Sequence, residues 1–257
     1  MSEAMNLKDG HIAKLSKAPL QEVIFEAFWE LDVDEKSRTQ YDPGYELAQG
    51  VFSNCLSKDF PHHVKIAPQL VPLQLLNHKP VHQFWRAPNE WPVIQLGPGI
   101  LAANVTEKNY VWETLFRPVI LQALDALLES YKQIPKFQKL SMRYIDAVEI
   151  DGTEKDSFLQ FIESNLQINV KRAFDIPGKI KGKSIQQVYS LSDDSQLQIA
   201  ISNGMKKNKR AVVWQTVIVK EKVFSSDEIR EWITYAHATI SDLFKRMLRK
   251  EYYDSLK

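Results

Sequence analysis

The sequence predicts an α+β protein in which antiparallel sheets are backed by long helices and one β-α-β-β-β-α unit occurs twice. Several segments alternate apolar and polar residues with the period of two that marks a half-buried strand. Two long segments, residues 110–131 and 225–248, carry wide apolar stripes at helical spacing, which a sheet must cover. The order of strands and helices in the first half of the chain recurs in the second.

The first predicted strand covers residues 20–31. Its apolar face consists of Val23, Phe25, Ala27, Trp29 and Leu31. A helix should follow, with Asp42 as its N-cap and Pro43 in its first turn, because both residue types are favoured there. The apolar positions of this helix are Ala48, Val51, Phe52, Cys55 and Leu56. Phe60-Pro61 should end it, since the residue before a proline disfavours helix.

The rest of the first half should form two strands and a long helix. A short strand is predicted around residues 83–86 and a longer one around 92–105. Gly97-Pro98-Gly99 lies inside the longer strand and should bend or bulge it. The apolar helix of residues 110–131 contains Pro118, which predicts either a kink or the true start of the helix.

The second half is predicted to repeat this order. Its strands are expected at residues 139–151, 184–191, 196–203 and 211–220. Asp156 should cap a short helix between the first two of them. A polar turn at residues 192–195 is typical of a hairpin. Ser225 and Glu228 have the spacing of a capping box at the start of the last helix.

Size and composition are those of one compact domain. The chain has 257 residues, 44% of them hydrophobic, and a net charge of +1, so it can bury a sizeable core. We expect a single domain over residues 1–257 with a loose arm at 1–17. Within it, residues 19–131 and 139–249 are predicted to be pseudo-repeats related by a pseudo-twofold axis.

The sequence also restricts the class of protein. The single cysteine, Cys55, cannot form an internal disulfide or a cysteine-rich zinc site. No segment approaches the ~18 apolar residues of a membrane span. The N-terminal residues hold no apolar run of signal-peptide length. These features predict a cytoplasmic protein that does not act at a membrane. The spacing of His62, His63, His78 and His82 fits no metal-site pattern, and neither a metal nor a cofactor is expected.

Four segments carry a resemblance to a known family. They are Ala18–Glu26; Gln95-Leu96-Gly97 with Asn104, Tyr110 and Trp112; Met142–Asp146; and His237 with Ile240 and Phe244. Over nearly the whole chain the sequence resembles a sporadically distributed bacterial family of about this length and of unknown function. Asparagine is expected to be commoner in that family at the position of Asp146, so the resemblance does not support a catalytic role there. The patchy distribution implies carriage on mobile elements, where defence and toxin–antitoxin genes also travel.

Five polar residues form the candidate site: Gln95, Asn104, Arg143, Asp146 and His237. Asp146 shares the apolar face of its predicted strand, and a buried carboxylate needs a hydrogen-bonding partner, for which Asn104 is the candidate. Arg143 points to the opposite face, and His237 lies at the edge of an apolar helical stripe. A structural polar network is the favoured interpretation, and a ligand pocket is the alternative.

Basic residues cluster in loops of the second half. Besides Lys171-Arg172, they are Lys179, Lys181 and Lys183, then Lys206, Lys207, Lys209 and Arg210 at the tip of a predicted hairpin. They could form a patch for a phosphate backbone. Aromatic residues that would stack on bases are not interleaved with them, which favours an ordinary solvated surface.

No catalytic motif is recognised, so the favoured hypothesis is a non-enzymatic protein that binds a partner protein encoded nearby. On the resemblance, it would be the neutralising half of a defence or toxin–antitoxin pair. One alternative is a nucleic-acid-binding protein that uses the basic loops. Another is an enzyme with an unfamiliar site near Asn104, Arg143 and Asp146. The sequence does not determine the oligomeric state.

Overall fold

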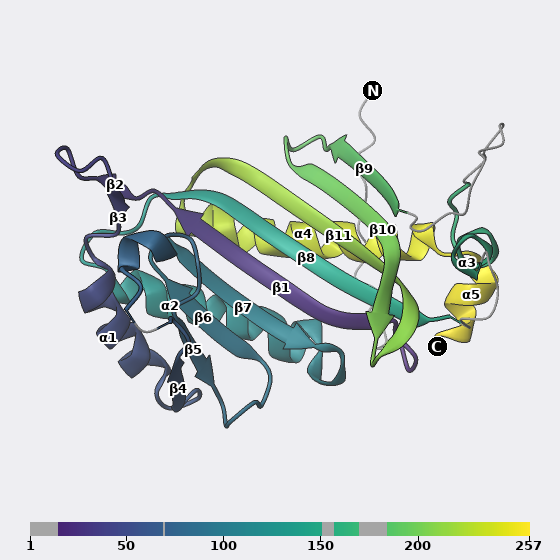
Figure 1. The fold of residues 1–257 in the computed structure, drawn as a ribbon, viewed down its shortest axis with the longest axis horizontal. Helices are drawn as coiled ribbons and strands as arrows, with labels where there is room; N and C mark the ends of the chain where they lie inside the picture. Colours follow the sequence, from purple (N-terminus) through teal and green to yellow (C-terminus); the bar gives the residue numbers. More distant parts are fainter. Residues whose placement is uncertain (1–14, 69, 151–156, 170–183) are drawn as a thin grey trace.

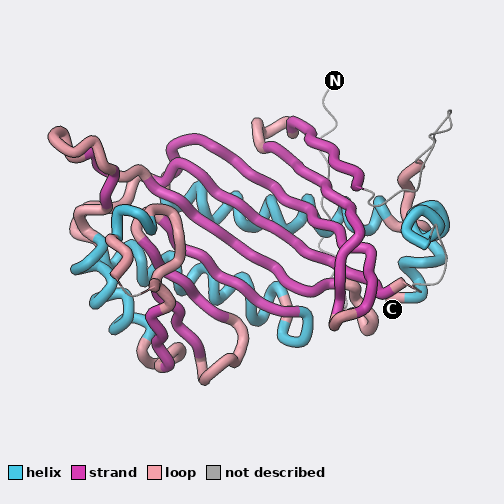
Figure 2. Tube along the Cα trace, in the orientation of Figure 1, coloured by secondary structure: helices cyan, strands magenta, loops and turns pink. Residues whose placement is uncertain are grey.

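The structure, a computed structural model, describes residues 15–68, 70–150, 157–169 and 184–257. Nine of its strands form one antiparallel sheet, and the long helices α2 (Arg117–Ser130) and α4 (Ser226–Met247) lie behind one face of it (Figure 1). No described helix covers the central strands on the other side, as Figure 2 shows. The predicted α+β class is confirmed. The uncovered side of the sheet is called the open face.

Strand β1 (Leu20–Trp29) lies at the centre of the sheet, between β7 (Ile100–Thr106) and β8 (Phe137–Glu149). The predicted alternation is confirmed, because one face of β1 is buried throughout: Val23, Phe25, Ala27 and Trp29. These side chains pack toward the helices. The residues between them therefore belong to the open face.

One continuous sheet runs through both halves of the chain. Its order is β4 (His62–Lys65), β5 (His82–Trp85), β6 (Val93–Gly97), β7, β1, β8, β11 (Lys209–Phe224), β10 (Gln196–Lys206) and β9 (Ser184–Ser190). The expectation of separate sheets is wrong, because β1 and β8 pair along most of their length and join the halves. The remaining described strands, β2 (Asp32–Val33) and β3 (Gln40–Tyr41), form a separate two-stranded sheet.

The helices begin and end for identifiable reasons. Pro118 lies in the first turn of α2, directly after a π-helical turn at Trp112–Phe116, so it marks the start of the α-helix. Ser225 and Glu228 form the predicted capping box before α4. The other described helices are α1 (Tyr45–Leu56), α3 (Ser157–Asn165) and α5 (Lys250–Ser255), and α5 was not predicted. Asp156, the predicted cap of α3, lies outside the described residues.

Residues 92–105 form two strands rather than one bulged strand. The chain reverses between β6 and β7 at Pro98-Gly99, where Gly99 has φ +74°. Proline followed by a glycine with positive φ suits a tight type II turn, which explains the reversal. At Gly97 a Cβ would lie 1.9 Å from the carbonyl oxygen of Lys79, so the close approach of these two backbones requires glycine.

Asp42 is not the N-cap of α1, because that helix begins after Gly44 and has no side-chain cap. The Asp42 carboxylate instead accepts hydrogen bonds from Trp29 Nε1 at 2.9 Å, Tyr131 Oη at 2.8 Å and the Gly99 amide at 3.2 Å. These bonds connect β1, the β6–β7 turn and the residue after α2. Burial, together with the charge of Asp42, raises the pKa of Tyr131.

The hydrophobic core lies between the sheet and the helices. The apolar stripes predicted for residues 110–131 and 225–248 are largely buried, as these residues show: Trp112, Phe116, Trp232, Ile233, Ile240 and Met247. Phe244 differs, because it is partly exposed and lines a pocket. Val51 is exposed, so the apolar face of α1 is narrower than its sequence indicates.

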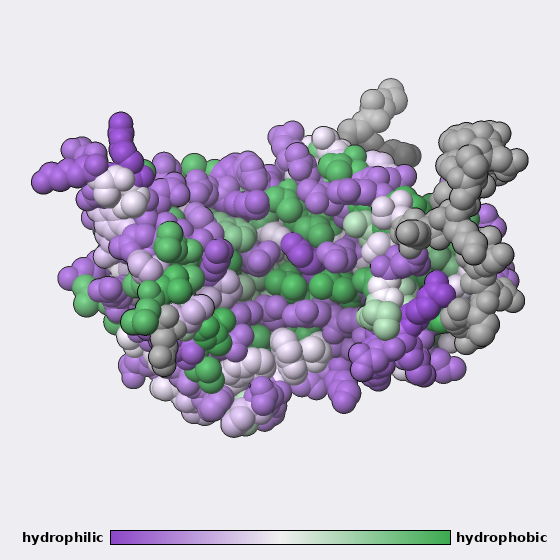
Figure 3. Space-filling model, viewed as in Figure 1, coloured by the Kyte–Doolittle hydropathy of each residue, from purple (hydrophilic) through white to green (hydrophobic). Residues whose placement is uncertain are grey.

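The open face carries apolar side chains over the central strands, between rows of hydrophilic ones (Figure 3). In the described residues, no helix combines the length and apolar character that crossing a membrane requires.

Candidate functional site

The five candidate residues lie on two sides of the sheet. Gln95, Asn104 and Arg143 belong to the open face, whereas Asp146 and His237 line a pocket on the helix-covered side. The division follows from the period of two along a strand, since Arg143 and Asp146 are an odd number of residues apart on β8. The expected pairing of Asn104 with Asp146 is therefore not formed.

On the open face, hydrogen bonds join five side chains from four neighbouring strands, and we call this set the polar row. Trp85 Nε1 donates to Gln83 Oε1 at 3.3 Å, and Gln83 Nε2 donates to Gln95 Oε1 at 3.2 Å. Gln95 Nε2 then donates to Asn104 Oδ1 at 3.1 Å, and Asn104 Nδ2 donates to Glu22 Oε1 at 2.8 Å. The row provides hydrogen-bond partners for the side-chain amide of Asn104, which is only 8% exposed. It also fixes the side chains beside Asn104.

Arg143 lies next to the polar row, on the same face. It stands opposite Ile24 of β1 and Val217 of β11. Its Nε atom is buried and has no hydrogen-bond partner. The side chain lines a depression of about 420 Å³, called the open-face hollow, whose other walls include Glu26, Phe28, Lys139, Gln198, Gln215 and Val219.

The second site lies between β8, α4 and the segment that precedes α2. It is a cavity of about 340 Å³, called the helix-side pocket. Its polar end is formed by Tyr110, Tyr144, Asp146 and His237, and its walls include Leu20, Val111, Trp112, Ile240 and Phe244. A mostly apolar pocket of this size is typical of small-molecule sites.

Two tyrosines and a histidine form a short hydrogen-bonded group in the helix-side pocket. The Tyr110 and Tyr144 hydroxyls are 2.7 Å apart, and Tyr144 Oη lies 2.7 Å from Nδ1 of His237. The His237 ring stacks on Trp112 with 3.9 Å between the ring centroids and 12° between the planes. Burial lowers the pKa of His237 to about 4 and raises that of Tyr144, so the group is uncharged at neutral pH.

Asp146 is the buried carboxylate of this pocket, whose lining also includes the exposed Glu107. Asp146 is 4% exposed, and no described side chain or amide donates a hydrogen bond to its carboxylate. Burial raises its pKa to about 7, against a weaker opposing effect of the Lys206 charge. Lys206 itself donates from Nζ to the carbonyl oxygen of Ala147 at 3.0 Å.

The basic loops are only partly described. Lys179, Lys181 and Lys183 lie outside the described residues, as does Lys171-Arg172. At the β10–β11 turn, Lys209 forms an ion pair with Glu149 at 3.0 Å, and Lys206 is held by Ala147. Lys207 and Asn208, the turn residues, both have positive φ, as a two-residue hairpin turn requires. Lys206 and Lys209 at this tip are thus engaged by the protein itself.

Sequence reasoning missed several members of both sites. The side chains of Glu22, Gln83 and Trp85 lie on the same face of the sheet as those of Gln95 and Asn104. Only the order and register of the strands reveal this shared face. Tyr110 and Trp112 belong to a motif that the sequence shows, but the sequence did not predict that both contact His237. In the described ranges, no group of three or more His, Cys, Asp or Glu side chains could hold a metal ion.

Comparison with known proteins adds no relative. No protein-family model matches the chain, and no curated protein matches it. The function must therefore be argued from these two sites.

Proposed function

We propose that this chain is a non-enzymatic binding protein that docks a partner protein on its open face. The observation that carries the proposal is the state of Arg143 in the open-face hollow. Its Nε is buried without an acceptor, and within the described residues it makes no ion pair, although Glu26 lines the same hollow. A buried donor without a partner costs free energy, which an incoming acceptor recovers. A carboxylate of the partner, held by the guanidinium fork, is such an acceptor.

The surroundings of Arg143 suit a protein surface. Ile24 and Phe28 of β1 and Val219 of β11 are partly exposed around it, and Val217 is almost covered. Apolar contacts around a charged anchor that loses its water are typical of the centre of a protein interface. The polar row beside it is already hydrogen-bonded, so it can be covered at little cost.

The partner is proposed to be encoded next to this chain's gene, with this chain as the neutralising half of a defence or toxin–antitoxin pair. The support for this step is the resemblance to a sporadically distributed bacterial family. The open face supplies a surface for such a partner, and the acidic residue that we assign to the partner makes the pairing testable.

We also propose that the fold descends from an internal duplication of residues 19–131 and 139–249. The strand order supports this, because β7, β6 and β5 follow outward from β1 as β11, β10 and β9 follow outward from β8. In each half the last strand leads into a long helix, α2 or α4. Superposition of the two halves tests the proposal, and long helices at non-equivalent positions on the sheet would contradict it.

A capture experiment tests the docking proposal. Full-length protein, Arg143→Glu and Lys58→Glu are used to capture partners from the native host, and the captured partner is then purified for titration. Lys58 is exposed and does not line the hollow, so Lys58→Glu makes the same charge change outside the proposed docking surface. We expect wild type and Lys58→Glu to bind the partner, and Arg143→Glu to lose about 100-fold in affinity.

The decisive arm is a charge exchange. Replacing the contacting acidic residue of the partner by arginine should restore binding to Arg143→Glu. Equal binding by Arg143→Glu and wild type would show that the open-face hollow is not the docking surface.

The same proteins test the nucleic-acid alternative. Reversing Lys206, Lys207, Lys209 and Arg210 to glutamate should leave partner binding unchanged. Wild-type protein should show only the ~10⁻⁴–10⁻⁶ M affinity for DNA or RNA that is typical of non-specific contacts near physiological salt. Nanomolar binding to a defined nucleic acid under those conditions, lost on the reversal, would favour the alternative.

A further inference from the structure

The helix-side pocket has no role in docking on the open face, since it lies on the other side of the sheet. Its two ends differ in chemistry. Leu20, Val111, Ile240 and Phe244 make the walls apolar, while Asp146 supplies a carboxylate at the polar end. A mostly apolar pocket with a buried carboxylate is a binding site for a molecule of matching polarity.

The Asp146 carboxylate lacks the partner that a buried charge requires. No described group donates a hydrogen bond to it, and Lys206, the cation whose charge acts on its pKa, donates its own hydrogen bond to the carbonyl oxygen of Ala147. A buried carboxylate without a donor is costly, and it either takes up a proton or pairs with a cation.

Lys108 and Lys245 also line the pocket, but both are exposed, and Lys206 is the cation whose charge acts on the pKa of Asp146. His237 is held neutral, with burial lowering its pKa to about 4, and it is engaged by Tyr144. Tyr110 and Tyr144 are hydrogen-bonded to each other. The pocket thus presents one buried carboxylate, Asp146, to which no described group donates a hydrogen bond.

We propose that the helix-side pocket binds a small apolar or aromatic molecule that carries a protonated amine, with the ammonium group on the carboxylate of Asp146. The ammonium group donates charge-assisted hydrogen bonds to that carboxylate. The apolar body lies against Ile240, Phe244 and Trp112, where it displaces water from apolar surface. The cavity of about 340 Å³ has room for a phenylethylamine-sized molecule.

Isothermal titration calorimetry tests the proposal with matched probes. The amines are 2-phenylethylamine, tryptamine and hexylamine, and 2-phenylethanol is the neutral analogue of the first. At about pH 8 the wild-type full chain should bind 2-phenylethylamine about tenfold more tightly than 2-phenylethanol, the gain expected from a charge-assisted contact. Equal affinities for these two probes, or no saturable binding of any of the three amines up to millimolar concentration, would overturn the proposal.

Two variants locate the site. Asp146→Asn keeps the size of the side chain and removes its charge, so it should remove the preference for the amine. Asp194→Asn makes the same change at an exposed turn residue and should retain the wild-type preference. Ser241→Phe places a ring on the pocket wall and should weaken the binding of 2-phenylethylamine and 2-phenylethanol to the same extent. A preference for the amine that survives in Asp146→Asn contradicts the assignment, and so does unchanged binding in Ser241→Phe.

The pH dependence gives an independent readout. The titratable groups around Asp146 are Tyr110, Tyr144, Tyr252, His237 and Lys206, and the pocket lining also includes Glu107, Lys108, Lys245 and Tyr253. The pKa of Asp146, at about 7, lies inside the pH range of the test. Amine affinity should therefore rise about tenfold between about pH 6 and pH 8, and Asp146→Asn should lose this rise. A flat profile in wild type would argue against pairing with Asp146.

A lysine side chain of a peptide offers the same ammonium group. N-acetyl-lysine methylamide is the probe for that source, and it should bind more weakly than 2-phenylethylamine because it places less apolar surface in the pocket. Tighter binding of the lysine probe would overturn the assignment to a free amine.

Discussion

Asp146 is a buried carboxylate whose pKa is raised by burial. Its pKa is about 7 in the folded protein, against 3.8 for an unperturbed aspartate, because burial penalises the charged form. The sequence indicated the burial, since Asp146 alternates with Met142 and Tyr144 on one face of β8. The sequence suggested Asn104 as the hydrogen-bonding partner of Asp146. Asn104 lies on the opposite face of the sheet, so Asp146 lacks this partner.

The pH dependence of stability should report this environment. Between pH 3.8 and about pH 7 the folded protein holds a proton on Asp146 that the unfolded chain has released. Stability from this group is therefore present at low pH and is lost as the pH rises through that window. Asp146→Asn should gain on the order of 4 kcal/mol relative to wild type between about pH 4 and pH 8.

Urea titrations of both proteins at several pH values measure the difference. The pKa of His237 is lowered to about 4, which makes stability rise with pH between that value and about 6.5. That contribution is present in both proteins and cancels. A difference independent of pH would mean that Asp146 is ionised in the folded protein throughout.

Among single side chains of α4, burial rather than residue type should set the cost of truncation. Ile233 is fully buried, whereas Phe244 is partly exposed on the pocket wall. Ile233→Ala should cost about 2–5 kcal/mol of unfolding free energy, and Phe244→Ala should cost less, although it removes more atoms. Denaturant titration of the two variants compares them. A larger loss in Phe244→Ala would show that the helix-side pocket closes over this ring in solution.

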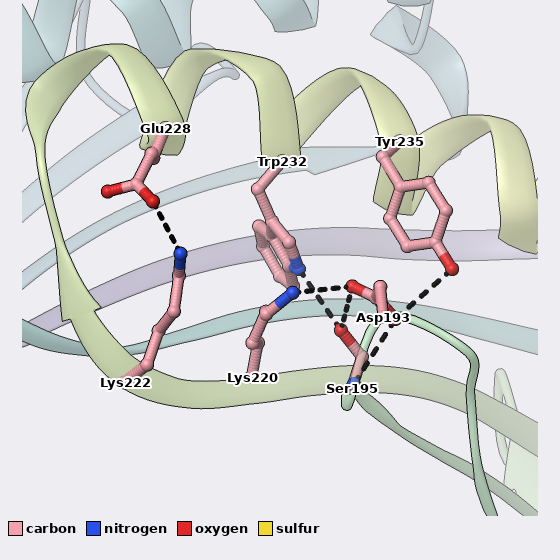
Figure 4. Close-up of polar contacts among 7 residues, drawn as sticks. All are labelled: Asp193, Ser195, Lys220, Lys222, Glu228, Trp232 and Tyr235. Atoms are coloured by element: carbon pink, nitrogen blue, oxygen red, sulfur yellow. Dashed lines mark hydrogen bonds and ion pairs between the residues drawn. The ribbon is translucent and has the colours of Figure 1, made fainter.

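At the scale of elements, Asp193 connects the β9–β10 turn to both β11 and α4 (Figure 4). Its carboxylate accepts from Lys220 Nζ at 2.9 Å, Ser195 Oγ at 2.6 Å and Tyr235 Oη at 3.2 Å. Trp232 Nε1 donates to Ser195 Oγ at 3.4 Å, which extends the contact into the core. Burial acts to raise the pKa of Asp193, but the hydrogen bonds from Ser195 and Lys220 outweigh it and lower the pKa.

Asp193→Ala should therefore cost about 2–3 kcal/mol, because it leaves Lys220 and the buried Ser195 without their acceptor. Asp194→Asn at the next, exposed position is the control and should change stability by less than about 0.5 kcal/mol, since asparagine tolerates the positive φ there. Hydrogen exchange at the amides of β9 should also accelerate in Asp193→Ala alone. Unchanged exchange would mean that β10 pairing by itself holds the turn.

At the scale of the whole molecule, the continuous sheet predicts one cooperative unit. The pairing of β1 with β8 joins the halves at the centre of the sheet, and the buried core extends across both. Thermal unfolding should give a single transition, with the calorimetric enthalpy equal to the van't Hoff enthalpy. Two separated transitions would instead indicate that the halves unfold independently.

The sequence alone determined most of the elements and their faces. Alternation identified β1 and its buried side, and the capping box identified the start of α4. Pro118 indicated either a kink or the start of a helix, and the structure shows that it lies at the start of α2. These features depend on residues close together in the chain, whose periodicity follows directly from strand and helix geometry. The α+β class follows from them.

Only the tertiary structure decided which elements meet. Strand periodicity specifies a face but not a neighbour, because every strand offers the same backbone groups to either side. The joining of both halves through β1 and β8, the polar row across four strands and the contact of Tyr144 with His237 all depend on that choice of neighbour. Both candidate sites are built from residues distant in sequence. The open-face site exists only once the sheet has formed, and the helix-side pocket only once α4 has packed against that sheet.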